Sequence, residues 1–484
     1  MWINIDKNSN TPLIRQLYNQ IKHLILDGQL AADEKLPSTR KLAMNLGISR
    51  STVLDAYNQL IAEGYLQGNH GSGTVVSGGI DIFFIPLKKP DKKHDLSVTL
   101  KKEPETMVID FQSGVIDSSL FPLRQWKKAY QRSFDQISET AFYYHPCAGV
   151  LKLRRTIADY LLRTRGLHCQ PDNIMIVSGA TQGLALISAL FHDQQQSVLI
   201  EDPTHPGLRK IIERSKLSLI GIPVDDRGMV TDLITPFLSP AFIYTTPSHQ
   251  YPLGGILPIQ RRQKLIQYAI AHDAYLLEDD YDSEFRFEGQ PVSSLYELNP
   301  DRVIYLGTLS KILTPAIRLG YLILPDKLIE PYLELKKYSD VHSEAFTQYA
   351  LSEFIENGEL EKHIWKMKKI YTKKRQHLIA ELSRCYPNDF EIKGHAAGLH
   401  MVVHFNGVVF DDTLINHINS QQVRVYPIAN YVFGNKAAYT SDILLGYAHL
   451  SFAEISMGIT RLCCALLNLE HKKDTPMSVE SNKK

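Results

Sequence analysis

The sequence lacks any apolar run close to the roughly 18 residues that a membrane-spanning helix requires, so it does not indicate a transmembrane protein. Cysteine is scarce, with five residues in 484, and the odd number and the adjacent Cys463 and Cys464 argue against a disulfide framework. Met1 is followed by no signal-peptide pattern. These absences predict reduced thiols and a cytoplasmic location.

The chain also lacks an excess of charge of either sign. Its 53 Lys and Arg residues against 52 Asp and Glu residues give a formal net charge of +1 at pH 7. A strongly basic balance would by itself have indicated nucleic-acid binding, so such a function has to be argued from motifs. At roughly 100–200 residues per domain, the length predicts more than one domain.

The run TLSKILTPAIRLGY, residues 308–321, places a lysine in a loop that leaves a predicted strand. Residues 303–306 form that short apolar strand, Lys311 follows it, and Arg318 comes seven residues later. Ligands bind at the carboxyl edge of open α/β sheets, and a lysine there can form a Schiff base with an aldehyde. A lone lysine is usually a solvated surface residue, so this interpretation depends on the neighbouring motifs.

Two further motifs complement the lysine. The apolar strand in AYLLEDDYDSEF, residues 274–285, ends in acids that would repel one another without a cationic partner, and the protonated ring nitrogen of pyridoxal phosphate is such a partner. A third strand, residues 174–177, leads through Ser178 and Gly179 into a helix start, where free amides and the helix dipole make an anion site. Anion site, acids, lysine and arginine together predict one cofactor.

These blocks resemble the fold-type-I, aspartate-aminotransferase-like pyridoxal-phosphate proteins. The resemblance implies an α/β domain with a mixed, mostly parallel sheet and a small C-terminal α/β lobe. A degenerate fold that kept the sheet and lost the ligand is the alternative. The resemblance assigns the Schiff base to Lys311, the pyridine nitrogen to Asp279, the phenolic oxygen to Tyr281, and the phosphate to Ala180, Thr181, Thr308 and Arg318, whose rigid fork matches phosphate oxygens.

The N-terminal residues alternate helix signals with turn signals. Pro12 begins a helix whose apolar residues recur on one face. Ser38 can cap a short second helix that Gly47 ends, and Ser49 can cap a third. Residues 66–76 read as a small glycine-rich hairpin. The result is a helix-turn-helix followed by a wing.

From about residue 12 to residue 76, this pattern resembles the winged helix-turn-helix of GntR-type bacterial regulators. The start of the third helix is the end that a recognition helix offers to the major groove. Arginine can contact phosphate or a guanine edge, and hydroxyls and amides can contact phosphate. A purely structural helix-turn-helix is the alternative. The resemblance implies DNA contacts from Arg40, Ser49, Arg50, Ser51 and Thr52, and from His70 and Gly71 of the wing.

We expect four regions along the chain. Residues 1–77 form the DNA-binding domain and residues 78–108 a linker, because proline and alternating charges replace apolar periodicity there. Residues 109–472 form the aminotransferase-like effector domain, and residues 473–484 a polar tail. The lysine pairs of the linker could touch DNA phosphates, but a solvated tether is favoured.

A GntR-type head joined by a linker to an aminotransferase-like body is the composition of the MocR family of transcriptional regulators. The blocks at residues 111–122, 201–207, 246–255 and 396–401 extend the resemblance over nearly the whole chain. It implies a homodimer, usually head-to-tail, in which Tyr144 reaches the phosphate of the neighbouring subunit. A tyrosine buried in its own subunit is the alternative.

Two positions depart from the family pattern. His205 stands where relatives usually carry a tyrosine that stacks on the pyridine ring; an imidazole can also stack, and it can charge near neutral pH. Leu444 stands where amino-acid-handling relatives have an arginine for the substrate carboxylate. Arg424 could substitute for that arginine, although an exposed strand position is equally compatible with its pattern.

Two functions therefore compete. In the first, the protein binds double-stranded operator DNA and its body senses pyridoxal 5'-phosphate, controlling vitamin B6 supply as in the PdxR branch, or responds to an amino acid or amine through the Schiff base. In the second, it is an active aminotransferase with an accessory head. A transaminase selects amino acids through a buried charged partner for their carboxylates, so Leu444 favours the regulator with at most residual transaminase activity.

Overall fold

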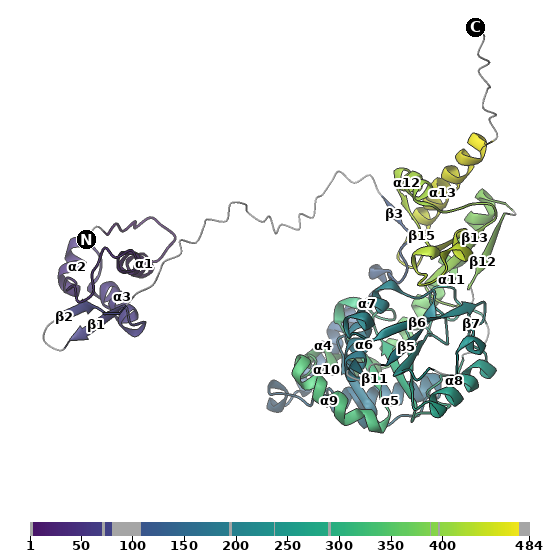
Figure 1. Cartoon of the computed structure of the whole chain (residues 1–484), viewed down its shortest axis with the longest axis horizontal. Helices are drawn as coiled ribbons and strands as arrows, with labels where there is room; N and C mark the ends of the chain where they lie inside the picture. Colours follow the sequence, from purple (N-terminus) through teal and green to yellow (C-terminus); the bar gives the residue numbers. More distant parts are fainter. Residues whose placement is uncertain are drawn as a thin grey trace, which may run out of the picture. The chain divides into compact units, whose positions relative to one another are not determined.

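The computed structural model describes residues 3–69, 73–79, 108–192, 196–236, 238–288, 292–387, 389–394 and 397–473. The chain divides into two compact units, a head within residues 1–103 and a body within residues 104–484 (Figure 1). None of the helices in the described ranges is long and apolar enough to cross a membrane. The predicted domain boundaries fall in or beside residues outside these ranges and stay predictions.

The head consists of three helices and a hairpin. Its core is formed by apolar residues of α1 and α3, among them Leu17, Ile21, Val53 and Leu60, which are fully buried. The spacing of these residues places them on one side of each helix, which explains why the helices pack together. The elements are α1 (Leu13–Leu26), α2 (Thr39–Leu46), α3 (Arg50–Ala62), β1 (Leu66–Asn69) and β2 (Gly73–Val76).

The caps that the sequence indicated lie at the ends of these helices. The Ser38 hydroxyl accepts the amide of Lys41, and Gly47 ends α2 in the left-handed conformation with φ 61°. The Ser49 hydroxyl caps α3 by accepting the amide of Thr52 at 3.1 Å. β1 and β2 pair antiparallel. The predicted wing residues His70 and Gly71 lie outside the described residues.

The body is built on a mixed, mostly parallel sheet. β11 runs antiparallel to both of its neighbours, β7 runs antiparallel to β6, and the strands from β10 to β6 are parallel. In order across the sheet, the strands are β4 (Ile174–Val177), β11 (Gly320–Ile323), β10 (Val303–Thr308), β9 (Tyr275–Asp280), β8 (Phe242–Thr245), β5 (Ser197–Asp202), β6 (Ser218–Asp225) and β7 (Gly228–Met229).

Helices cover both faces of this sheet. Successive residues of a strand point to opposite faces, and accordingly Met175 and Val177 belong to one hydrophobic cluster while Ile174 and Ile176 belong to the other. This double burial explains the nearly continuous apolar strands. The helices are α4 (Leu123–Gln136), α5 (Leu151–Arg165), α6 (Ala180–Leu190), α7 (Pro206–Arg214), α8 (Ile259–Ala271), α9 (Asp326–Asp340), α10 (Phe346–Glu356) and the long α11 (Glu359–Cys385).

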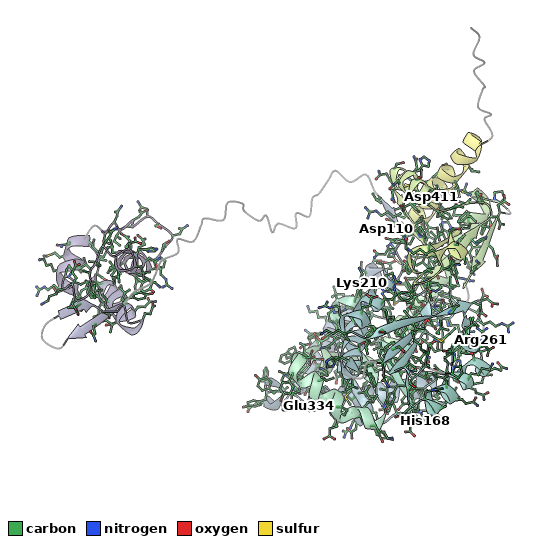
Figure 2. All side chains as sticks on the ribbon, viewed as in Figure 1. Asp110, His168, Lys210, Arg261, Glu334 and Asp411 are labelled. Atoms are coloured by element: carbon green, nitrogen blue, oxygen red, sulfur yellow. The ribbon has the colours of Figure 1, made fainter. Side chains whose placement is uncertain are left out.

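A smaller lobe at the C-terminal end of the body contains a four-stranded antiparallel sheet (Figure 1). Asp110, labelled in Figure 2, lies in β3 and accepts a hydrogen bond from Tyr426 at 2.8 Å, so the first strand of the body is fixed to this lobe. The lobe's sheet strands, in order across the sheet, are β12 (Phe390–Lys393), β13 (His400–Phe405), β16 (Asp442–Gly446) and β15 (Tyr426–Pro427); β3 (Ile109–Asp110) pairs with β14 (Val423–Arg424), and the helices are α12 (Asp412–Ser420) and α13 (Phe452–Lys473).

Candidate functional site

A cavity of about 510 Å³ lies in the body where several parallel strands end. It lies beside the carboxyl ends of β8, β9 and β10, the start of α6 and the first residues of β13. The carboxyl ends of parallel strands meet at one edge of a sheet, which is why residues distant in the sequence meet here. Six of the residues predicted from the sequence line this cavity: Ala180, Thr181, His205, Asp279, Tyr281 and Lys311.

Lys311 lies in the cavity wall, so the interpretation as a solvated surface lysine does not hold. Its ammonium group donates a hydrogen bond to the carbonyl of Gly114. Burial lowers the pKa of Lys311, and the carboxylates of Asp282 and Asp279 oppose that effect only in part. A lowered pKa increases the fraction of neutral amine, which is the nucleophilic form.

The acids around Asp279 have partners elsewhere in the body. The sequence indicated only that such a cluster requires a cation, without showing where each carboxylate points. The structure separates them, because successive side chains of a strand alternate between faces. Glu278 accepts the amide of Tyr296, Asp280 forms an ion pair with Arg165 at 2.8 Å, and Asp282 contacts His249 at 3.0 Å.

Like Glu278 and Asp280, Asp279 keeps one oxygen without a hydrogen-bond partner among the described residues, but of these three acids only Asp279 lines the cavity. Its Oδ2 accepts a hydrogen bond from the Tyr244 hydroxyl at 2.5 Å, whereas its Oδ1 is buried and has no hydrogen-bond partner among the described residues. Burial raises the pKa of Asp279 to about 7, and the Tyr244 hydrogen bond opposes the shift. A cationic group in the cavity would satisfy the unpaired oxygen and keep the carboxylate ionised.

The start of α6 provides an anion site at another part of the cavity wall. Gly179 precedes the helix with φ 87°, and among the described residues no side chain caps α6. The Arg318 guanidinium donates to the carbonyl of Ser178 at 2.5 Å and lies against Gly179, where an added Cβ would come within 3.1 Å of Nη2. Arg318 is therefore positioned beside the helix start, whereas Thr308 ends β10 opposite Gly320 of β11, and neither residue lines the cavity directly.

His205 lies at the cavity with its ring 5.5 Å from that of Tyr251. Its Nδ1 accepts the amide of Gly207 and thereby caps α7. Burial, together with the nearby Lys311 charge, lowers the pKa of His205. The lowered pKa disfavours a charged imidazole near neutral pH. Of the two roles expected for His205, stacking as a neutral ring on the pyridine is therefore favoured over a change of charge.

Tyr144 is 85% exposed and meets the ring of His342 edge-on at 6.0 Å. The alternative of a tyrosine buried in its own subunit is therefore wrong. Tyr144 does not line the cavity of its own chain, and its role toward a neighbouring subunit stays a prediction.

Neither Leu444, which stands in place of the expected arginine, nor Arg424, the possible substitute for it, lines the cavity. Leu444 is fully buried in β16, opposite Val402 of β13 and Tyr426 of β15. Arg424 is largely exposed in β14, and its guanidinium lies 3.7 Å from Asp110. No arginine is found among the described residues that line the cavity.

Sequence reasoning missed several residues that complete the site. Tyr244, Tyr251, Asp282 and His400 line the cavity, and His249 lies directly behind Tyr281. The block TPSHQYPLGG was noticed only as a family resemblance. This block, residues 246–255, contains His249 and Tyr251, and its density of polar and aromatic side chains directly after an apolar strand is the signal that could have indicated their roles; Tyr244, Asp282 and His400 lie outside it.

The predicted DNA-contacting residues that the structure describes lie on and beside α2 and α3. Arg40, Ser49, Arg50 and Ser51 are exposed, and Thr52 is half-buried. The Ser49 hydroxyl is already engaged in capping and lies 2.7 Å from the Thr52 hydroxyl. Arg50 and Ser51 are therefore the side chains best placed to meet DNA from the start of α3.

Comparison with known proteins agrees with both units. Residues 13–76 match the bacterial regulatory proteins of the gntR family, and residues 106–462 match aminotransferase class I and II. The body is similar to a kynurenine aminotransferase of Pyrococcus horikoshii solved with PMP, with a TM-score of 0.68 and 25% identity over 75% of this chain and 91% of that one. The predicted fold class is thus confirmed.

Relatives match along nearly the entire chain. It is 35% identical to the HTH-type transcriptional regulator YdeL of Bacillus subtilis, covering 95% of this chain and 98% of that one. The chain is 30% identical to the probable rhizopine catabolism regulatory protein MocR of Rhizobium meliloti, over 98% of this chain and 97% of that one. It is 32% identical to the pyridoxine biosynthesis transcriptional regulator PdxR of Corynebacterium glutamicum, over 92% of this chain and 94% of that one. The chain belongs to the MocR-type transcriptional regulators, which join a GntR head to an aminotransferase-like body.

Proposed function

We propose that this regulator binds pyridoxal 5'-phosphate in its body through Lys311 and that the bound cofactor changes how the head binds operator DNA. The observation that carries the proposal is one cavity whose wall includes an amine of lowered pKa, together with a carboxylate oxygen and a helix start that have no side-chain partner among the described residues. Pyridoxal phosphate has an aldehyde, a basic ring nitrogen and a phosphate. Each of these three groups has a chemical counterpart in the cavity.

The residues of the cavity fit the aldehyde, the ring nitrogen and the phosphate of the cofactor. Lys311 supplies the amine for the aldehyde. Asp279 offers Oδ1, which is buried without a partner among the described residues, and a protonated ring nitrogen would complete it. The amides of Ala180 and Thr181 at the start of α6, with Arg318 beside them, would hold the phosphate.

When bound, the cofactor supplies an electron-withdrawing ring conjugated to its aldehyde. The protein's own contribution is to hold and orient this ring. Burial lowers the pKa of Lys311, and the Tyr244 hydroxyl fixes the Asp279 carboxylate in place. His205 and Leu306 form further parts of the cavity wall.

We further propose that the signal concerns vitamin B6 supply. A transaminase requires a buried charged partner for the substrate carboxylate, and the described residues lining this cavity include no arginine. Leu444 belongs to the core of the small lobe, and Arg424 is exposed beside Asp110. These features favour recognition of the cofactor itself over amino-acid turnover. The relative named for pyridoxine biosynthesis supports the same direction.

We also propose a homodimer, arranged head-to-tail. Phe142, Tyr143 and Tyr144 are consecutive aromatic residues that are each more than two-thirds exposed in the single chain. Large apolar side chains gathered on a surface favour association. Light scattering of the purified protein tests the dimer, and a Tyr144→Ala variant that stays dimeric but binds pyridoxal phosphate more weakly supports the role of Tyr144 across the interface.

The decisive experiment measures DNA affinity with and without the cofactor. The probe is the promoter region upstream of the protein's own gene, with pyridoxal phosphate added to cofactor-free protein. A coupling of about 1–3 kcal/mol is expected, and the same DNA must change cofactor affinity by the same factor. Rapid multiple-turnover transamination, combined with DNA binding indifferent to the cofactor, would instead identify an enzyme with a passive head.

A further inference from the structure

A buried histidine and aspartate lie directly behind Tyr281. His249 follows β8 and Asp282 follows β9, and their residues are only 2% and 1% exposed. The Nδ1 atom of His249 lies 3.0 Å from Asp282 Oδ2 and 2.8 Å from the Tyr281 hydroxyl oxygen. One ring nitrogen therefore contacts both the carboxylate and the hydroxyl.

Electrostatics determines whether Nδ1 of His249 carries a proton. An imidazole nitrogen carries either a proton or a lone pair, and a lone pair facing a buried carboxylate would be repelled in a medium of low dielectric. Burial would lower the pKa of His249, but the Asp282 carboxylate, with a smaller contribution from the backbone of Gly394, outweighs that effect and raises the pKa. The arrangement thus favours a proton on Nδ1, shared between Asp282 and the Tyr281 oxygen.

We infer that the His249–Asp282 pair acts as a positioning device that turns the Tyr281 hydroxyl proton into the cavity, toward the phenolic oxygen of bound pyridoxal phosphate. A hydroxyl oxygen that accepts from Nδ1 directs its own proton elsewhere, and Tyr281 lines the cavity. Burial raises the pKa of Tyr281 well above its ordinary value, so the hydroxyl keeps the proton that it donates. This inference rests on the proposed cofactor.

The surrounding structure holds the pair rigidly. Gly398, with φ 85°, packs its backbone so closely that an added Cβ would come within 2.2 Å of His249 Cε1 and 2.6 Å of Asp282 Oδ2. The Gly398 amide donates to the carbonyl of Phe285 at 2.9 Å, which fixes this approach. A side chain at position 398 would displace the pair, so the glycine is a geometric requirement of this arrangement.

Several charged or titratable groups face the pair and have to be considered in any pH titration. The ring of His400, from β13, lies 5.3 Å from that of His249, and burial lowers the pKa of His400 to about 3. Arg286 acts on His249, and Lys311 acts on Asp282. Asp280 also acts on Asp282, and Asp279 acts on Tyr281. Because His400 stays neutral above pH 5, it does not contribute its own titration step near neutrality.

The test is a double-mutant cycle read by absorbance. The pH midpoint of the Lys311-linked chromophore is measured in the full-length protein loaded with pyridoxal phosphate, and in the Tyr281→Phe, Asp282→Asn and double variants. A hydrogen bond to a charged oxygen contributes about 1.5–3 kcal/mol, which at 1.36 kcal/mol per unit corresponds to roughly one to two pH units. Tyr281→Phe should raise the midpoint by that amount, because the ionised phenolic oxygen loses its donor.

Asp282→Asn has two effects of opposite sign, which the cycle separates. Without the carboxylate, the His249 proton can move to Nε2, Nδ1 can accept from Tyr281, and the lost donor raises the midpoint. Loss of the negative charge near Lys311 lowers the midpoint in every background. If Tyr281 mediates the first effect, the shift caused by Asp282→Asn in the otherwise unaltered protein differs by about one pH unit from its shift in the Tyr281→Phe variant. Equal shifts in both backgrounds would refute positioning.

A second variant and a prior measurement keep the outcome clear. Should Asp282→Asn fail to fold, His249→Gln takes its place in the same cycle, with the same expected coupling to Tyr281→Phe. Borohydride labelling of Lys311 in the unaltered protein is measured first. No label would contradict the proposed function, whereas a labelled lysine with additive shifts contradicts only the role of the pair.

Discussion

The head and the body carry their predicted functional residues in opposite ways. In the head, Ser49, Arg50 and Ser51 are consecutive and exposed, and their geometry depends on one helix cap. In the body, Lys311, Asp279 and the start of α6 come from distant segments and meet only because parallel strands end at one edge. Replacing an exposed side chain of the head, such as Arg50, should therefore affect DNA affinity with little effect on the fold, whereas replacing a buried acid of the body, such as Asp279, should alter ligand binding and stability together.

The largest expected effect is the loss of covalent cofactor binding in Lys311→Ala. Borohydride reduction followed by peptide mass spectrometry should find the cofactor on Lys311 in the unaltered protein and nowhere in the variant. The fold should persist, because a loop lysine contributes little packing. Lys210, an exposed lysine of α7 labelled in Figure 2, provides the matched control as Lys210→Ala. A label on any other lysine would overturn the assignment.

The second effect concerns pH and the cofactor-free body. Burial raises the pKa of Asp279 to about 7, above the unfolded value of 3.8. A carboxyl group with a raised pKa binds more protons in the folded state, so its contribution falls as pH rises from about 4 through 7. The melting temperature of the cofactor-free protein should therefore drop between pH 6 and pH 8. For a body of this size, each kcal/mol lost from the free energy of unfolding lowers the melting temperature by roughly 2–4 °C or less.

Asp279→Asn isolates this contribution. The variant should show a shallower drop between pH 6 and pH 8, because the amide does not titrate, and it should also bind pyridoxal phosphate at least ~10-fold more weakly. Glu278 and Glu284, whose pKa values burial raises to about 7, contribute a residual slope in both proteins. Identical slopes in the two proteins would show that Asp279 does not titrate in this range.

A smaller effect is expected in the head from Arg50→Ala. If Arg50 contacts a base edge, operator affinity should fall by about 1–3 kcal/mol and selectivity should relax at one position. If it contacts only phosphate, the loss should be uniform and the salt slope should decrease by about 1. Arg15→Ala on α1 removes the same charge from another exposed position of the head. Equal losses in both variants would indicate that α3 is not the recognition helix.

The smallest effect should come from Ser49→Ala, which removes the cap of α3. The hydroxyl accepts the Thr52 amide at 3.1 Å, and losing such a cap costs about 1 kcal/mol of stability. A fluorescence or hydrogen-exchange probe of α3 in the full-length chain reports this loss. Ser9→Ala, at another exposed serine before α1, serves as the control. Equal protection of α3 in both variants would contradict the capping role.

The difference between head and body also explains which features of the fold and the site could be predicted from the sequence. Caps at Ser38 and Ser49 and the strand before Lys311 follow from local rules, because the relevant partners lie within a few residues. The partners of the acid cluster do not follow from local rules, since Asp280 of strand β9 pairs with Arg165 of helix α5. No local pattern indicates such a pairing.

The same limit applies to the deeper part of the site. Tyr244 reaches Asp279 across 35 positions, and His249 reaches Asp282 across 33. These contacts depend on the order of strands in the sheet, which a single sequence does not specify. The sequence indicated Leu444 as a departure from the family pattern, but its place within the core of the small lobe depends on the strand register.

The hydrogen bond from Lys311 to Gly114 ties the cofactor site to the beginning of the body. Gly114 lies shortly after β3, where Phe111 bonds to Arg424 and Gly446 of the small lobe at 3.0 and 2.8 Å. A covalent bond at Nζ reduces the three donors of the ammonium to one at most and makes the nitrogen planar. Occupying the lysine with an aldehyde would therefore leave at most one N–H for the Gly114 carbonyl, and we expect cofactor binding to loosen the hold of this lysine on the first segment of the body.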